Sequence, residues 1–370
     1  MIKKTKVAVI QLAYADFESL EISLANYSKS LNEDIHFFIL QNGRGTYDCE
    51  RTYKVAKRYE KLFPNIIKVV DWIAPKSPYY AIKELIESKT LEQYDYICKL
   101  DDDVFPLRTD WLDKLINCYN ESEKQYGSSL GYITGLVNNN PWGFSETLDI
   151  FGLKEEYYSN IARVHEVGGY GFEPAKIINE REIYTGCCGT VWGNPYISRW
   201  LHINTSFKPE IFIEKTKDLG FKEVNNQKRY SINVMLFKKD YWNNISDDSG
   251  DDEHMSAVYC KNNDKKIIAD LSNPFVHICF FTQRDENKDL LPEFRKIYGD
   301  WLNLPYPISL CPCKEYENEN RLRYIENKYS KLLLPNDFWG NVFSIRNNRD
   351  KTHKIITILG IKIHIKRRMK

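Results

Sequence analysis

The first hundred residues alternate between short apolar runs and amphipathic segments, and this alternation is the strongest constraint on the fold. Four apolar runs are typical of β-strands: "KVAVIQL", "DIHFFILQNG", "NIIKVVDW" and "DYICKL". Between them, residues 16–31, 48–63 and 77–94 carry apolar side chains at helical spacing. Strands and helices that alternate with short connections predict an α/β fold, in which a mostly parallel sheet is covered by helices on both faces.

Polar residues follow three of the predicted strands at their carboxyl ends. Asn42 ends the second strand, Asp71 lies at the end of the third, and Asp101–Asp103 follow the fourth in "YICKLDDDVF". Ligands bind outside the carboxyl ends of the strands in open parallel sheets. Three adjacent carboxylates repel one another, and a divalent cation such as Mn²⁺ or Mg²⁺ would offset that repulsion. Because such an ion also binds phosphate oxygens, the acids indicate a diphosphate site, although a solvated charged loop is the competing interpretation.

The order of these segments, ending in "ICKLDDDV", resembles the nucleotide-sugar half of glycosyltransferases with the GT-A fold. The family 2 group, which includes bacterial surface-polysaccharide enzymes, is the most similar, and the resemblance extends over about residues 5–280. It implies that Asp103 and Asp101 bind the metal ion of the donor. Asp101 and Asp102 would lie near the ribose.

The same resemblance places Tyr14 beside the nucleotide base, with Asn42 and Asp71 as further donor contacts. The family's second strand usually ends on an Asp that contacts the base. This chain has Gln41-Asn42 there, so the identity of the donor base stays open.

A second acid cluster, "SGDDEHMS", resembles the acidic pair that the family carries at the start of a helix. The resemblance implies that Asp252, beside Asp251, accepts the proton of the acceptor hydroxyl, which predicts inversion at the anomeric carbon. Like-charge repulsion from Asp251 and Glu253 would raise the pKa of Asp252. The stretch is also similar to a calcium loop, but Gly250 is misplaced for an EF-hand and the distal acid is missing.

His277, in "NPFVHICFF", falls where some GT-A enzymes have a further metal ligand. A histidine on an apolar strand is also compatible with a core position, so both interpretations stay open. The same choice applies to three aromatic residues that either stack on sugars or fill the core: Trp142, Tyr184 and Trp192.

The pattern of segments divides the chain into four consecutive regions, and the resemblance implies the roles of the first two. They are a nucleotide-sugar half over residues 1–130, an acceptor-binding and catalytic half over 131–285, a helical extension over 286–345, and a basic amphipathic tail over 346–370. The tail, "DKTHKIITILGIKIHIKRRMK", alternates isoleucines with basic residues. Such a segment is attracted to anionic lipid surfaces, and it equally fits a final hairpin packed on the body.

The composition narrows the class of protein. Lys and Arg (52) balance Asp and Glu (51), so no overall field favours nucleic acid. Nine cysteines include no CxxC pair, which favours reduced thiols and a cytoplasmic location over a zinc or disulfide framework. "MIKKTKVAVIQLAYAD" has the outline of a signal peptide, but Gln11 interrupts its short apolar stretch and favours a first strand. No apolar run approaches the ~18–20 residues of a membrane span.

These features predict a metal-dependent, inverting glycosyltransferase. It would transfer a sugar from a nucleotide-diphosphate donor to a glycan or lipid-linked saccharide, as in lipopolysaccharide or capsule synthesis, with the tail in contact with the inner face of the cytoplasmic membrane. One alternative is a sugar nucleotidyltransferase, which normally has a Gly-rich phosphate loop where this chain has "QLAYADFES". The other is a non-catalytic glycan-binding protein on the same fold.

Overall fold

A computed structural model describes most of the chain. The described residues are 7–32, 35–72, 76–139, 141–161, 176–178, 181–183, 195–227, 229–245, 251–278, 287–299, 343–347, 353–358 and 361–366. The chain forms two compact units, Met1–Leu304 and Pro305–Lys370. Tyr184 and Trp192, the two predicted sugar-stacking residues beyond Trp142, lie outside the described residues.

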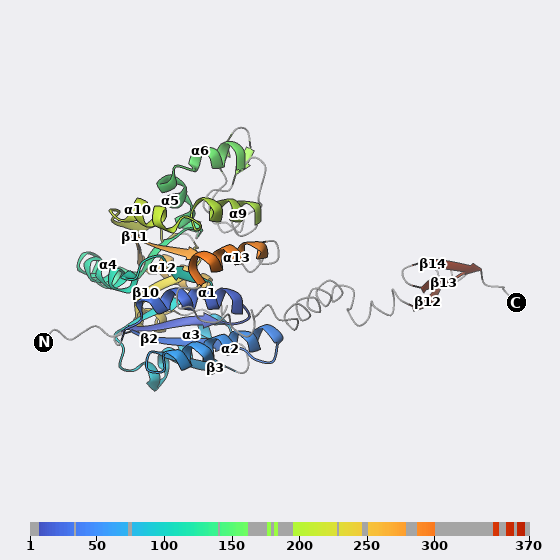
Figure 1. Cartoon of the computed structure of the whole chain (residues 1–370), viewed down its shortest axis with the longest axis horizontal. Helices are drawn as coiled ribbons and strands as arrows, with labels where there is room; N and C mark the ends of the chain where they lie inside the picture. The colour runs from blue at the N-terminus through green and yellow to red at the C-terminus, as the bar shows by residue number, and fades with distance from the viewer. Residues whose placement is uncertain are drawn as a thin grey trace. The chain divides into compact units, whose positions relative to one another are not determined.

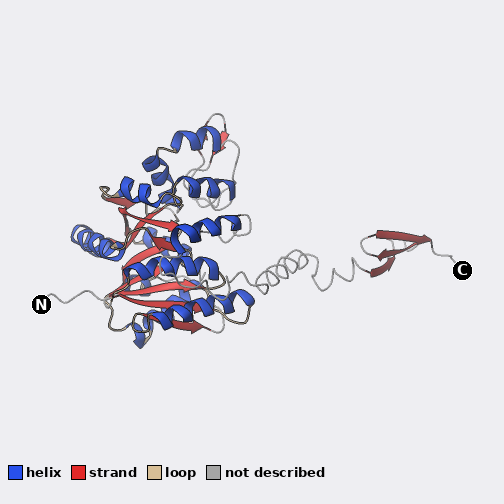
Figure 2. Ribbon diagram, viewed as in Figure 1, coloured by secondary structure: helices blue, strands red, loops and turns tan. Residues whose placement is uncertain are grey.

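The first unit begins with four parallel strands joined by helices (Figures 1 and 2). The strands are β1 (Val7–Ala13), β2 (Ile35–Asn42), β3 (Ile67–Trp72) and β4 (Tyr96–Leu100). The helices are α1 (Phe17–Tyr27), α2 (Tyr47–Leu62) and α3 (Pro78–Glu87), with 3-10 turns η1 (Ser28–Ser30) and η2 (Lys89–Leu91). The strands lie in the order β3-β2-β1-β4, all parallel. The predicted α/β class is confirmed.

Further strands extend this sheet beyond β4. They are β5 (Val104–Pro106), β6 (Leu130–Val137), β9 (Phe221–Val224), β10 (Val234–Lys238) and β11 (Lys266–His277). The complete sheet of nine strands has the order β3-β2-β1-β4-β10-β6-β11-β5, and β9 pairs with β11. Strand β10 is antiparallel to both β4 and β6, whereas β11 is parallel to β6. The pairing of β5 with β11 brings the residues after β4 beside the end of β11.

Helices surround the second half of the sheet. They are α4 (Trp111–Tyr126), α5 (Pro141–Phe151), α6 (Lys154–Glu156), α9 (Pro195–Asn204), α10 (Pro209–Thr216), α11 (Lys239–Asn243), α12 (Asp252–Asn262) and α13 (Leu291–Phe294). Shorter elements are the 3-10 helices η3 (Gly127–Ser129) and η5 (Lys288–Leu290), the π-helices η4 (Tyr157–Ile161) and η6 (Arg295–Gly299), and a separate hairpin of β7 (Lys176–Ile178) and β8 (Arg181–Ile183). Helix α12 carries the second acid cluster at its first turn.

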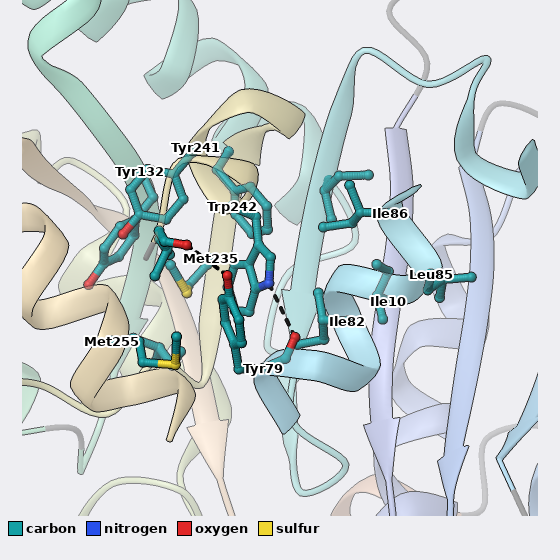
Figure 3. Packing of buried hydrophobic residues seen from close by; sticks show 14 of the residues in the cluster. Ile10, Tyr79, Ile82, Leu85, Ile86, Tyr132, Met235, Tyr241, Trp242 and Met255 are labelled. Atoms are coloured by element: carbon teal, nitrogen blue, oxygen red, sulfur yellow. Dashed lines mark hydrogen bonds between the residues drawn. The ribbon is translucent and has the colours of Figure 1, made fainter. Parts of the chain in front are cut away.

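The core lies on both faces of the sheet because successive strand residues point to opposite sides. On one face, Phe37 of β2 meets Tyr27 of α1, with ring centroids 5.1 Å apart. On the other face, Ile10 belongs to a large cluster that includes Tyr79 of α3 and Trp242 of α11 (Figure 3). The Tyr79 and Trp242 rings stack with centroids 5.6 Å apart, and the Trp242 indole N–H donates to the Tyr79 carbonyl. The same cluster contains Met255, one turn into α12, which anchors the start of that helix.

The second unit contains a three-stranded antiparallel sheet of β12 (Phe343–Asn347), β13 (His353–Ile358) and β14 (Ile361–Lys366). Its register aligns Ile345, Ile356 and Ile363 in one row across the strands. The predicted helical extension is helical over η5, α13 and η6, but its last residues, 343–345, form a strand. The reason is local, since "FSIRN" alternates apolar and polar residues with a period of two. Within the described residues, no helix is long and apolar enough to cross a bilayer.

Candidate functional site

Asp101, the first acid after β4, is paired inside the protein. Its Oδ1 lies 2.5 Å from the Nζ of Lys99, and its Oδ2 accepts a hydrogen bond of 2.9 Å from the Asn233 side chain. Its backbone N–H donates to the carbonyl of Asn233 at 3.1 Å. Asp101 therefore has its charge offset by a lysine of its own strand, and its predicted metal and ribose contacts stay predictions.

Lys99 connects the two acid clusters. Its side chain is only 2% exposed, and its Nζ also donates to the carbonyl of Ile232 at 2.9 Å. A third neighbour, Oδ2 of Asp252, lies 3.5 Å away. Burial lowers the pKa of Lys99, but the charges of Asp101 and Asp252 raise it more, so Lys99 is held as a cation. The end of β4 and the start of α12 thus meet around one buried ammonium group.

Asp103 and His277 form the second contact of the site. The Asp103 Oδ2 lies 3.0 Å from the His277 Nε2, and both side chains are nearly buried. The pairing of β5 with β11 explains this contact, because Val104 lies opposite His277 and the Ile278 N–H donates to the Asp103 carbonyl. Burial lowers the pKa of His277, but the Asp103 carboxylate raises it more, and the net pKa lies above the ordinary value. Two of the three predicted metal ligands, Asp103 and His277, are therefore side by side.

The donor set of Asp103 and His277 fits a divalent ion. A carboxylate oxygen and an imidazole nitrogen are ligands that Mn²⁺ accepts, and Mg²⁺ sites often use one or two carboxylates with phosphate and water in the other positions. Across the described residues, no group of three or more His, Cys, Asp or Glu side chains gathers as a complete metal site. If this pair bound such an ion, it would fill only part of the coordination shell, and the other positions would be open to phosphate or water.

Of the three acids at the start of α12, the outer two share Arg229 and the middle one faces Lys99. Asp251 caps the helix, since its Oδ1 accepts from the His254 N–H at 2.9 Å, and Arg229 donates to both Asp251 (2.8 Å) and Glu253 (3.2 Å). Asp252 lies between them, is buried, and faces Lys99. This arrangement brings the predicted base close to the acids after β4.

Burial is the main reason why the pKa values of Asp252 and Glu253 are raised. It raises the pKa of Asp252, against the opposing charge of Lys99. Burial, followed by the charge of Asp252, raises the pKa of Glu253 to about 7. The like-charge repulsion expected around Asp252 is present, from Asp101 and Asp251, but it is smaller than the effect of burial. Glu253 is thus an acid that titrates near neutral pH beside the predicted base.

Tyr14 and Asp102 lie together at the same edge of the sheet. The Tyr14 backbone N–H donates to the Asp102 Oδ2 at 3.4 Å, and the Tyr14 ring is 45% exposed. An exposed aromatic ring beside strand-end carboxylates is compatible with stacking on a base, which stays a prediction.

The other predicted donor contacts make loop contacts in this structure. The Asn42 side chain donates to the carbonyl of Lys76 at 2.7 Å and accepts from its N–H at 2.8 Å. Asp71 forms an ion pair with Arg44 at 2.8 Å, and Arg44 also donates two hydrogen bonds of 2.9 Å to the Glu50 carboxylate. Both side chains therefore fix the loops that follow β2 and β3, whereas their contact with a donor is untested.

Several residues of the site were missed by sequence reasoning. Lys99 gave a signal, because a lysine inside the buried run "YICKL" has to be paired. The sequence around Asn233 and Arg229 contains no such signal, because the contacts of these residues depend on long-range packing. Trp142 is partly buried and packs against the large core cluster, which agrees with the core interpretation.

No protein-family model and no curated protein matches this sequence. One solved structure similar to the chain is that of GalNAc-T7 with UDP, GalNAc and Mn²⁺, at 8% sequence identity and a TM-score of 0.42. The match covers 95% of this chain and 62% of that chain, so this chain spans less than two thirds of that protein. A likeness this distant does not define a function, and the chemistry has to be argued from the side chains.

Proposed function

We propose that this chain is a metal-dependent glycosyltransferase that transfers a sugar from a nucleotide-diphosphate donor to a hydroxyl of a glycan or lipid-linked saccharide. The observation that carries the proposal is the meeting of two distant acid clusters at the carboxyl edge of the sheet. Asp101 and Asp252 share Lys99, and Asp103 faces His277 beside them. A donor site and a proton acceptor are the two parts that such a transfer needs.

On the donor side, Asp103 and His277 would hold Mn²⁺ or Mg²⁺. When bound, the ion would offset the negative charge that builds on the leaving diphosphate. Four other residues at this edge are proposed donor contacts: Tyr14, Asn42, Asp71 and Asp102. The exposed ring of Tyr14 supports a stacking contact with the base.

On the acceptor side, Asp252 would act as the base. The acceptor oxygen forms a bond to the anomeric carbon, the bond from that carbon to the diphosphate breaks, and the hydroxyl proton moves to the Asp252 carboxylate. Lys99 favours the ionised form of this carboxylate, against the effect of burial, which raises the pKa of Asp252. Asp251 supports it by capping α12. Direct displacement of this kind inverts the anomeric configuration.

The acceptor is proposed to be a bacterial surface glycan, such as lipopolysaccharide or capsule, extended in the cytoplasm. A lipid-linked acceptor would suit peripheral contact between the basic tail and an anionic membrane. The alternation of isoleucines with basic residues in the sequence of the tail supports that contact. The overall balance of charge, 52 Lys and Arg against 51 Asp and Glu, argues against a nucleic-acid partner.

The experiment that tests the proposal is a screen of UDP- and GDP-sugars as donors in the presence of Mn²⁺. The assay measures the nucleoside diphosphate that the reaction releases. We expect Asp252→Asn to keep donor affinity and to lower turnover by about 10²–10⁴-fold, which is the usual contribution of a general base. Asp149→Asn, an exposed acid on α5, is the matched control and should have normal turnover.

Two results would contradict the proposal. Normal turnover of Asp252→Asn would exclude this residue as the base. No metal-dependent binding of any donor would favour the non-catalytic glycan-binding protein, and formation of a sugar nucleotide from a nucleoside triphosphate would favour a nucleotidyltransferase.

A further inference from the structure

We infer that Asn139 is a positioning residue, which fixes the imidazole ring of His277 so that its Nε2 faces the Asp103 carboxylate. The role that this gives the pair, as a prepared half of a divalent-cation site, rests on the proposed function. The orientation of the ring itself does not.

The hydrogen bonds of Asn139 set the direction of its amide. Its Nδ2 donates to the carbonyl of His277 at 2.9 Å, so its Oδ1 is the atom that meets the ring. The Oδ1 lies 2.8 Å from the His277 Nδ1. An amide oxygen can only accept, and therefore the Nδ1 carries the proton. The remaining ring nitrogen, Nε2, is the one that lies 3.0 Å from Asp103.

The neighbouring Asn138 holds the backbone of the same histidine. Its Oδ1 accepts from the His277 N–H at 3.1 Å, and its Nδ2 donates to the Ser206 hydroxyl at 2.9 Å. The Ser206 hydroxyl in turn lies 3.0 Å from the His202 Nδ1. Together, the two asparagines bind the N–H, the carbonyl and the Nδ1 of His277. The asparagines thereby contact each polar atom of His277 other than Nε2, and Nε2 is the atom that faces Asp103.

The sheet explains why two consecutive asparagines reach this histidine. Strand β6 runs parallel to β11, and their last pair is Val137 with Phe275. Asn138 and Asn139 continue directly past β6 and so run beside His277 at the end of β11. Strand pairing thus places Asn138 and Asn139 against a predicted metal ligand.

Burial makes this positioning stringent. Asn139 is 4% exposed and His277 is 6% exposed, so water cannot replace the lost hydrogen bonds. A histidine that binds a metal usually donates its other N–H to an outer partner, and removing such a partner weakens metal binding about 10- to 100-fold. Asn139 has the geometry of such a partner.

The first test uses the metal-free full-length protein labelled with ¹⁵N-histidine. The chain has seven histidines, and His277→Gln assigns the signal of His277. We expect a slowly exchanging Nδ1–H for His277 in the wild type and its loss in Asn139→Leu. Asn226→Leu, which also removes a buried hydrogen-bonded amide, is the matched control and should keep the signal. An Nδ1–H that is unchanged in Asn139→Leu would overturn the inference.

Should Asn139→Leu fail to fold, Asn139→Asp provides the test. Aspartate keeps an acceptor oxygen opposite the His277 Nδ1 and replaces the amide donor by a second oxygen. The variant should therefore retain the Nδ1–H signal. Loss of that signal in a folded Asn139→Asp would count against the inference.

The second test measures Mn²⁺ affinity from the electron paramagnetic resonance of free Mn²⁺. We expect Asn139→Leu to bind about 10- to 100-fold more weakly, and the double variant with His277→Gln to bind no more weakly than His277→Gln alone. Wild-type affinity in Asn139→Leu would overturn the positioning role. A wild type that binds no Mn²⁺ would overturn the proposed metal and the cation half-site, whereas the Nδ1–H result judges the ring orientation separately.

Discussion

Replacing Glu253 by glutamine should stabilise the protein at and above neutral pH. Burial and the charge of Asp252 raise the pKa of Glu253 from 4.5 to about 7 in the folded state. A carboxyl whose folded pKa is raised contributes stability below its unfolded pKa, and this contribution is lost as the pH rises through the folded value. The wild type should therefore lose stability between pH 4.5 and about 7, and a glutamine, which does not ionise, should not.

The magnitude follows from the two pKa values. A difference of 7 − 4.5 = 2.5 units at about 1.36 kcal/mol per unit gives about 3 kcal/mol as an upper value. The side chain is 22% exposed, so solvent should reduce this value only in part. Glutamine keeps an acceptor for Arg229, which now lies 3.2 Å from Glu253, and that contact should not dominate the difference.

Urea unfolding of both proteins across pH 4–8 measures the effect. The stability difference between Glu253→Gln and the wild type should be smallest near pH 4 and should approach about 3 kcal/mol at pH 8. Glu121→Gln, an exposed residue of α4, is the control and should show no such rise. A difference that is constant over this range, or that grows toward low pH, would refute the reasoning.

Two further substitutions test the packing of the site. Lys99→Met removes the cation between Asp101 and Asp252 and should lower the free energy of unfolding by about 3–5 kcal/mol. Urea unfolding measures this loss, and a variant as stable as the wild type would contradict the buried ion pair. Gly135→Ala adds a Cβ that would lie 2.6 Å from the Asn273 carbonyl oxygen. This contact should lower the free energy of unfolding by about 1–3 kcal/mol and lower the Tm. An unchanged Tm would contradict the close approach of β6 and β11.

The first half of the fold was predictable from local pattern. The strands ending at Asn42, Trp72 and Leu100 and the helices between them follow from apolar periodicity and short connections. The second half was not, because β10 inserts between β4 and β6 in the antiparallel direction. Nothing within "VMLFK" specifies those neighbours, which are chosen by long-range packing.

The sequence predicted which acidic residues lie at the site, but it did not predict the side chains that pair with them. Asp103, Asp252 and His277 were expected at one site, and the structure brings them to one edge of the sheet. The expectation that a divalent cation offsets the repulsion within the aspartate triplet did not include protein partners, whereas Lys99 and Asn233 pair with Asp101 in the structure. Such pairing depends on residues far apart in the sequence, which no local motif reveals.

The most direct test of the proposed glycosyl transfer is calorimetric titration of a UDP-sugar into the wild type and Asp103→Asn, each with and without Mn²⁺. We predict donor binding by the wild type only when Mn²⁺ is present, and at least about tenfold weaker binding by Asp103→Asn. Donor binding by Asp103→Asn that equals the wild type, or the same binding with and without the ion, would contradict the role given to Asp103 and His277.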